Sequence, residues 1–166
     1  MAALRLSGRQ IKTNGELPPI GSVAPEFRLT NKALEDMSLK DFAGKKRLLN
    51  IVPSLDNKTC EVSTRKFNAS FEGRDDAVGL VISADLPFAQ KRFCTIDEIT
   101  NITALSMMKD RLFAQDYGVL MTDGPLVGLC ARAVVVIDAA GLVLHSQLVP
   151  DITDEPDYAA ALRALN

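Results

Sequence analysis

Residues 47–85 read RLLNIVPSLDNKTCEVSTRKFNASFEGRDDAVGLVISAD, and this stretch decides the fold class. Its two ends, residues 47–54 and 77–85, are mostly apolar runs, as expected for strands that are covered on both faces. From Cys60 onward, apolar residues recur at helical spacing while polar residues take the other side. A strand, a helix and a second strand in this order predict an α/β or mixed sheet.

The rest of the chain extends this alternation. We expect one domain over residues 1–166, with a thioredoxin-like α/β fold in which helices flank a central mixed sheet behind an N-terminal β-hairpin. The alternation by itself also fits other small α/β folds. The further elements expected are a hairpin over 4–21 with a turn signal at Asn14-Gly15, a strand over 25–31, a helix between Ser38 and Gly44, helices over 85–97 and 106–118, a hairpin over 131–149 and a closing helix over 154–166.

Composition excludes several function classes. The chain has 166 residues and a net charge of −2, and no basic stripe indicates a nucleic-acid partner. No apolar run approaches the ~20 residues of a membrane helix, and Arg5 interrupts the few apolar residues at the N-terminus, so we expect no membrane span and no secretory signal. Three cysteines fit poorly with a secreted disulfide framework, and we therefore expect a cytoplasmic protein with reduced thiols.

Cys60 stands where an apolar strand gives way to a polar stretch that starts a helix. The six residues before it, SLDNKT, would pack poorly in a core, although free cysteines are often small buried hydrophobes. A helix N-terminus carries unpaired N–H groups and a partial positive charge, and both favour a thiolate over a thiol. Because the thiolate is the nucleophile, the pattern favours a reactive cysteine in the first turn of a helix.

Three stretches carry a family resemblance. They are PSLDNKTC with STRKFN from residue 53, VISADLPFAQKRFC over residues 81–94, and DGPLVGLCARAVVVID with SQLV and EPDYAAAL from residue 123. Together they closely resemble the bacterial thiol peroxidases, which are atypical two-cysteine peroxiredoxins. The resemblance covers nearly the whole chain, and the second stretch is the most specific because it carries Cys94 in its family setting.

The resemblance implies a thioredoxin-dependent peroxidase, typically homodimeric, that reduces hydrogen peroxide and alkyl hydroperoxides in antioxidant defence. The Cys60 thiolate would attack the peroxide and become a sulfenic acid, releasing water or an alcohol. Cys94 would be the resolving cysteine, and thioredoxin would reduce the resulting Cys60–Cys94 disulfide. Arg132 matches the family's active-site arginine, which would favour the thiolate and hold the peroxide oxygens. Without the resemblance, Arg132 reads as an exposed strand charge, and the residues around Cys94 leave its role open.

The chain departs from the family pattern at one position. The family motif is Pro-x-x-x-Thr/Ser-x-x-Cys, and here it runs from Pro53, which would shield the site, to Cys60 with Asn57 at the hydroxyl position. In the family that hydroxyl forms hydrogen bonds with both the peroxide and the sulfur. An amide is larger, and it cannot rotate one group to act as both donor and acceptor, as a hydroxyl can. We expect a working peroxidase that is slower than a threonine relative. The alternative is a redox sensor or low-activity variant that keeps the fold and the disulfide.

The remaining cysteine and the histidine give little indication of a further functional site. Cys130 lies two residues before Arg132 and could approach the same site, but a core thiol is the favoured interpretation. The only histidine, His145, has no ligand cluster beside it, so we expect no metal, and no phosphate-binding motif indicates a cofactor. No Cys-x-x-Cys pair is present, which disfavours a disulfide reductase. If Cys94 is held in a helix, we expect local unfolding around it during each cycle, because a disulfide needs Cα atoms within about 7 Å.

Overall fold

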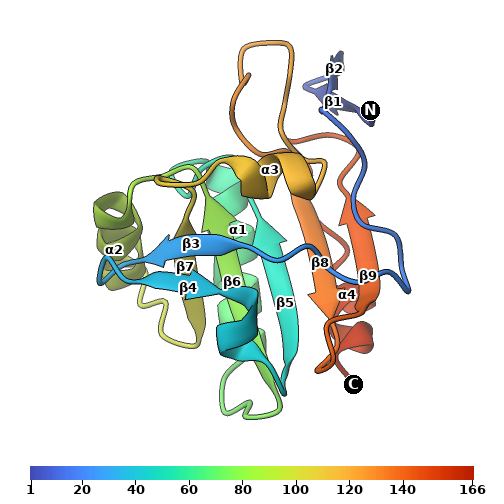
Figure 1. Cartoon of the computed structure of the whole chain (residues 1–166). Helices are drawn as coiled ribbons and strands as arrows, with labels where there is room; N and C mark the ends of the chain where they lie inside the picture. The colour runs from blue at the N-terminus through green and yellow to red at the C-terminus, as the bar shows by residue number, and fades with distance from the viewer.

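The computed structural model describes residues 1–166 and is built around one mixed sheet of seven strands (Figure 1). The strand order across the sheet is β4-β3-β7-β6-β5-β8-β9, and a separate two-stranded hairpin precedes it. The elements are β1 (Ala3–Leu6), β2 (Arg9–Lys12), β3 (Arg28–Asn31), β4 (Asp36–Ser38), the 3-10 helix η1 (Leu39–Phe42), β5 (Lys46–Ile51), α1 (Lys58–Ser70), β6 (Ala77–Ser83), α2 (Pro87–Ile96), β7 (Ile102–Ser106), α3 (Leu112–Asp116), β8 (Ala133–Ile137), β9 (Val143–Leu148) and α4 (Tyr158–Ala164).

The β5–α1–β6 unit forms the centre of the molecule, as the opening stretch of sequence predicted. β5 and β6 pair in parallel from Lys46 opposite Ala77 to Ile51 opposite Ile82, and β8 pairs antiparallel on the other side of β5. Almost every residue of these strands is buried, because the sheet is covered on both faces. The first turn of α1 therefore starts just beyond the carboxyl end of a central strand.

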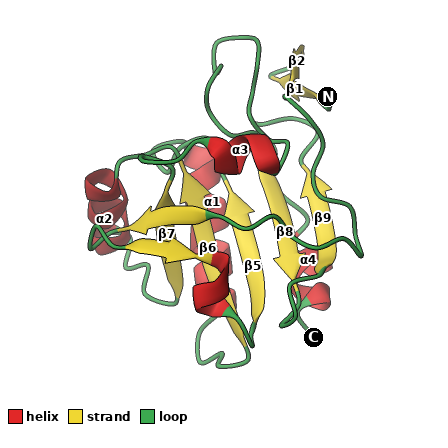
Figure 2. Ribbon diagram, in the orientation of Figure 1, coloured by secondary structure: helices red, strands yellow, loops and turns green.

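Alternate residues of the strands enter two different cores, one on each face of the sheet. Helices α1 and α4 lie behind the sheet in the view of Figure 2, while η1 lies in front of it. The core on the α1 side includes Leu48, Val81, Phe67 and Ala161. The core on the other side includes Leu49, Leu80, Ile11 and Phe113. The period-two alternation of the strands thus gives each face its own apolar layer.

The N-terminal hairpin is confirmed, but its turn is not at Asn14-Gly15. Strands β1 and β2 are joined at Ser7 and Gly8, which both have positive φ values of 50° and 85°, as a two-residue hairpin turn with right-handed strand twist requires. Asn14 instead follows β2, and its side chain accepts a hydrogen bond from Leu120 N–H at 3.1 Å and donates one to the Gln115 carbonyl at 3.0 Å. The Asn-Gly pair therefore docks the hairpin on the body of the protein.

Strand β7 was not predicted, and most of the predicted helix over 106–118 is wrong. Ser106 ends β7, where it pairs with Ser83 of β6 and Thr30 of β3. The helix is the short α3 alone, which ends at Asp116, and the predicted stop, Gly118, follows its C-cap with a φ of 69°. Long-range pairing with two strands outweighs the weak helical spacing of this segment, because the edge of β6 would otherwise lack a partner.

The predicted helix after Ser38 is only the four-residue η1, and Gly44 follows it with a φ of 87°.

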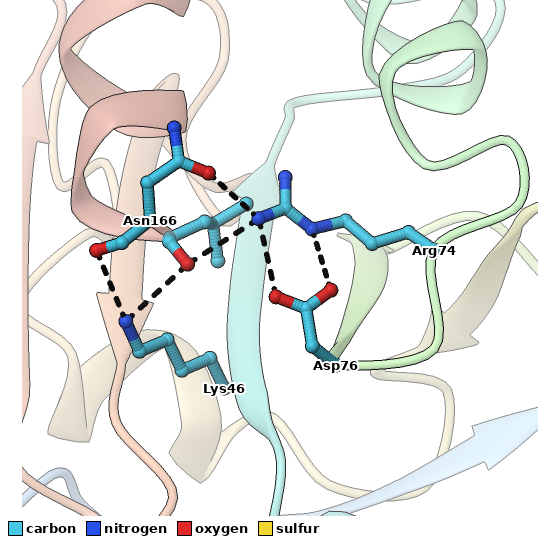
Figure 3. Close-up of polar contacts among 5 residues, drawn as sticks. Lys46, Arg74, Asp76 and Asn166 are labelled. Carbon is cyan, nitrogen blue, oxygen red and sulfur yellow. Dashed lines mark hydrogen bonds and ion pairs between the residues drawn. The ribbon is translucent and has the colours of Figure 1, made fainter.

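Helix α4 closes the chain and its end is tied to the body by two cations (Figure 3). Lys46 Nζ and Arg74 Nη2 donate to the Leu165 carbonyl, both at 3.3 Å, while Arg74 is itself held by Asp76. These contacts fasten α4 to the end of the sheet opposite the first turn of α1.

Candidate active site

Cys60 lies in the first turn of α1, as the sequence predicted, and its residue is fully buried. Helix α1 begins at Lys58, so Cys60 is its third residue and its backbone N–H has no partner within the helix. The carbonyl of Asn57 accepts the first intrahelical bond, from Glu61 N–H at 2.9 Å. The sulfur therefore sits at the positive end of the helix dipole, which favours a negative charge there.

Arg132 is the group that contacts the sulfur. Its Nη1 donates to Cys60 Sγ at 3.2 Å, and the arginine is fully buried. The other side of the guanidinium is fixed by the Ile152 carbonyl, which accepts from Nε at 3.0 Å and from Nη2 at 2.8 Å. A cation that faces a cysteine sulfur favours its charged form, whereas burial of the sulfur opposes it.

Asn57, at the hydroxyl position of the family motif, starts helix α1. It is the N-cap of α1, and its side-chain Oδ1 accepts from Thr59 N–H at 3.0 Å and from Cys60 N–H at 3.4 Å. Asparagine is among the best N-cap residues, so the helix is well started. The same two bonds occupy backbone donors beside the sulfur that a substrate oxygen could otherwise use. The amide Nδ2 makes no hydrogen bond to the protein.

The loop between β5 and α1 is fixed by Asp85, a residue that the sequence analysis did not single out. Pro53 is buried at the start of this loop. Asp85 Oδ1 accepts from Ser54 Oγ at 2.7 Å, and its Oδ2 accepts from Leu55 N–H at 2.8 Å and from Ser83 Oγ at 2.6 Å. No local pattern announces this role, because the aspartate lies 30 residues from the loop in sequence.

Cys94 lies in α2, on the same side of the sheet as Cys60. Its residue is 5% exposed, and both cysteines belong to one apolar core. Burial raises the pKa of the Cys94 thiol, and a weaker opposing effect comes from the charge of Lys32. Both thiols are free in the structure. Helices α1 and α2 are also joined through Arg65, which pairs with Glu61 at 3.0 Å and with Asp97 at 3.1 Å.

A groove of about 620 Å³ runs between the loop before α1 and helix α2. Its walls are partly apolar and partly charged, and Phe88 and Ile96 on α2 are more than half exposed. The lining residues are Leu55, Asp56, Glu61, Phe88, Ala89, Arg92, Phe93, Ile96 and Asp97. The groove thus borders both cysteine-bearing helices.

Cys130 and His145 lie away from this centre. Cys130 is fully buried in the core on the opposite face of the sheet, and its Sγ donates to Met107 Sδ at 3.5 Å. Burial raises the pKa of the Cys130 thiol to about 12. His145 lies on β9, and partial burial lowers the pKa of its imidazole. No group of three or more His, Cys, Asp or Glu side chains is arranged to hold a metal ion.

Comparisons with known proteins identify the family of this chain. A family model described as Redoxin matches residues 19–162. Thiol peroxidases of Corynebacterium glutamicum and Mycobacterium tuberculosis are 45% and 48% identical, over 100% and 99% of both chains. The chain therefore belongs to the redoxin family and, within it, to the thiol peroxidases.

Solved structures confirm the thioredoxin-like fold. A peroxiredoxin-like protein from Aquifex aeolicus superimposes with a TM-score of 0.94 at 38% identity, covering 99% of this chain and 96% of that one. A thiol peroxidase from Chromobacterium violaceum gives a TM-score of 0.91 at 25% identity, covering 98% and 94%. The activity is that of a peroxiredoxin-type oxidoreductase, in which a cysteine thiol reduces a peroxide. No helix combines the length and apolar character needed to cross a membrane.

Proposed function

We propose that this chain is a thioredoxin-dependent peroxidase that works through an intrachain Cys60–Cys94 disulfide. The Cys60 thiolate attacks the terminal oxygen of the hydroperoxide, the O–O bond breaks, and an alcohol or water leaves. Cys60 becomes a sulfenic acid, and the Cys94 thiol condenses with it to give the disulfide and water. Thioredoxin then reduces the disulfide by thiol exchange, which restores both thiols.

The contact between Arg132 and Cys60 carries this proposal. A fully buried guanidinium at 3.2 Å from the sulfur favours the thiolate, and its planar donors suit an oxygen that gains negative charge as the O–O bond breaks. In this proposal Pro53 shields the sulfur from bulk water. Asn57 takes the place of the family hydroxyl, with only its Nδ2 left to donate to the peroxide.

We propose hydrogen peroxide and alkyl hydroperoxides as substrates. The groove beside α1 supports the second class, because the apolar side chains of Leu55, Phe88 and Phe93 can accept an alkyl chain. A peroxide that carries such a chain would bury apolar surface that hydrogen peroxide lacks.

Disulfide formation requires local unfolding, because both thiols are buried and each is held within a helix. We expect α2 around Cys94, together with the first turn of α1, to open in each cycle. Hydrogen exchange of reduced and oxidised protein measures this opening. Equal protection of both segments in the two states would contradict it.

We propose a homodimer in the cytoplasm. Leu86, Phe88 and Ile96 leave more than half of their surface exposed along α2, and a second copy of the chain would cover them. Three cysteines fit poorly with a secreted disulfide framework, and the cytoplasm supplies thioredoxin and keeps cysteines reduced. Sedimentation of reduced and oxidised protein gives the oligomeric state directly.

The first experiment gives fully reduced protein one equivalent of hydrogen peroxide and follows thiol loss, with peptide mass analysis of the product. We expect rapid loss of two thiols and a Cys60–Cys94 linked peptide that thioredoxin reverses. Cys94→Ser should stop the reaction at the sulfenic acid. Oxidation of Cys60 no faster than that of an unfolded cysteine would overturn the proposal.

A redox sensor is the second candidate, and the capping bonds of Asn57 are the observation that favours it. Because Oδ1 holds the N–H groups of Thr59 and Cys60, fewer donors remain for the peroxide. A sensor would form the disulfide and keep it, whereas an enzyme would turn over. Steady consumption of peroxide in the presence of thioredoxin and its reductase separates the two.

A further inference from the structure

A short segment after β9, Pro150–Thr153, contacts two parts of the active site, and we call it the strap. Its Ile152 carbonyl accepts both hydrogen bonds that fix Arg132, at 3.0 and 2.8 Å. Its Thr153 carbonyl accepts from Thr59 Oγ1, in the first turn of α1, at 3.2 Å. The strap therefore touches both the cation and the helix that position the sulfur of Cys60.

The strap is in turn held by the N-terminal hairpin. Arg5 in β1 donates its N–H to the Pro150 carbonyl at 2.8 Å, and its own carbonyl accepts from Ile152 N–H at 2.9 Å. Arg5 and Asp151 thus form a short parallel bridge between strand β1 and the strap. In Figure 1 the hairpin lies beyond the upper end of β9, where the strap begins.

Asp151 joins the strap to the hairpin turn through its side chain. Oδ1 accepts from Ser7 N–H at 3.2 Å, and Oδ2 accepts from Gly8 N–H at 3.2 Å. Oδ1 also accepts from Thr153 N–H at 3.0 Å and from Thr153 Oγ1 at 2.7 Å, which shapes the strap itself. These bonds, those to Thr153 first, lower the pKa of the Asp151 carboxyl to about 2, so it stays ionised at neutral pH.

We propose that Asp151 is a positioning residue for the peroxidatic centre. It fixes the strap against the hairpin turn, the strap fixes the Ile152 carbonyl, and that carbonyl fixes the guanidinium of Arg132 against Cys60. Asp151 itself touches neither the sulfur nor Arg132 by any hydrogen bond. Its effect is geometric: without it, the Ile152 carbonyl moves and the donors of Arg132 are no longer aligned with the sulfur.

The positioning role of Asp151 can be tested without peroxide, but its importance for peroxide reduction rests on the proposed function. A displacement of about 1 Å in a catalytic group is enough to lower a rate by up to about a hundredfold. The strap keeps its backbone bonds to Arg5 when the side chain of Asp151 is removed. We therefore expect a smaller loss than for Arg132 itself.

The test measures alkylation of Cys60 by iodoacetamide as a function of pH, in a full-length Cys94→Ser, Cys130→Ala background where Cys60 is the only thiol. Asp151→Ala should lower the rate at pH 7 by about three- to tenfold and move the half-maximal pH upward. Asp151→Asn keeps one acceptor oxygen for Ser7 and Thr153 but loses the acceptor for Gly8 N–H, so its rate should lie between those of the parent and Asp151→Ala. If both variants keep the parent rate and pH profile, the positioning role is wrong.

Asp123 offers a matched control. Asp123 accepts from Lys12 N–H at 2.6 Å, so it holds strand β2 of the same hairpin and makes no hydrogen bond to the strap. Asp123→Ala should lower the melting temperature as Asp151→Ala does, yet leave the pH profile of alkylation unchanged. An equal shift in both variants, or no shift in Asp151→Ala, would overturn the proposal.

The two proposals fail in different ways. Alkylation requires only the thiolate and no peroxide turnover. If the parent protein consumes no peroxide while its alkylation still depends on Asp151, the peroxidase proposal fails and the positioning role stands. If peroxide is consumed at the same rate by Asp151→Ala and the parent, the positioning role fails and the peroxidase stands.

Discussion

Cys60 and Cys130 are both fully buried, yet their sulfurs face opposite surroundings. The sulfur of Cys60 meets a guanidinium at the start of a helix, and that of Cys130 meets the thioether of Met107 in an apolar core. Burial raises the pKa of the Cys130 thiol to about 12, against a smaller lowering effect of the charge of Arg111. The group that faces a buried thiol, rather than the extent of its burial, therefore decides whether the thiol can act as a nucleophile.

The largest expected effect comes from removing the partner of Cys60. Arg132→Met keeps an apolar stem but removes the donors, so we expect the second-order rate with hydrogen peroxide to fall by about 10²- to 10³-fold. Stopped-flow measurement of peroxide consumption gives the rate. Arg132→Lys should lie between the two, because an ammonium keeps the charge but lacks the planar fork whose separate nitrogens bond the sulfur and the Ile152 carbonyl. If the rate of Arg132→Met stays within about threefold of the parent, Arg132 does not control the reactivity of Cys60.

Asn57→Thr should have the next largest effect, in the opposite direction. A threonine still caps α1, and its hydroxyl can both donate and accept near the sulfur. We expect the rate with hydrogen peroxide to rise by about ten- to a hundredfold, with little change in the melting temperature. Asn57→Ser is the companion variant and should also gain. An unchanged rate in both would mean that the asparagine does not limit the reaction.

A smaller effect is expected at the ion pair between the two cysteine helices. Arg65→Ala removes the link from Glu61 in α1 to Asp97 at the end of α2. In the proposed cycle α2 opens before the disulfide forms, so we expect disulfide formation to become about two- to fivefold faster. Peroxide attack on Cys60 should keep its rate, and rapid quenching with mass analysis separates the two steps. Arg74→Ala, which removes an ion pair far from α2, is the control.

The smallest effect on activity is expected at Cys130. Cys130→Ala should keep the peroxide rate within about twofold, because this thiol lies in the other core. A pKa of about 12 leaves ~10⁻⁴ of the thiol ionised at pH 8, so N-ethylmaleimide should label Cys130 only after unfolding. Cys130→Ser should lower the free energy of unfolding by about 1–3 kcal/mol, since its hydroxyl would be buried against a thioether. Labelling of Cys130 in the native protein would contradict this.

The sequence predicted those parts of the fold that local pattern controls. The central strands, the start of α1 near Cys60 and the hairpin over 131–149 follow from apolar runs, a polar interval and a turn. Strand β7 was missed because ITALS is short, and its neighbours β3 and β6 determine its conformation. The hairpin turn was misplaced because Asn14-Gly15 has a stronger turn signal than Ser7-Gly8, but it is used for docking.

Only those site residues that lie in a recognisable local motif could be predicted from the sequence. Cys60 was indicated by its polar setting, whereas Arg132 depended on the family resemblance, since its burial cannot be seen from neighbouring residues. Asp85 and Asp151 escaped notice because each acts on a loop or turn distant in sequence, and Asp151 is 144 residues from Ser7. No local signal distinguishes such a carboxylate from an ordinary loop aspartate.

The order of residues around the sulfur has a consequence for synthesis of the protein. Arg132 follows Cys60 by 72 residues, and Ile152 follows Arg132 by another 20. At an elongation rate of about 5–20 residues per second, the nascent chain therefore carries Cys60 for on the order of ten seconds before its cation can be placed. The guanidinium can be fixed beside the sulfur only after the segment with Ile152 has been made. The site that we propose for peroxide reduction therefore assembles long after Cys60 itself has been synthesised, and until then the cysteine lacks the cation that favours its thiolate.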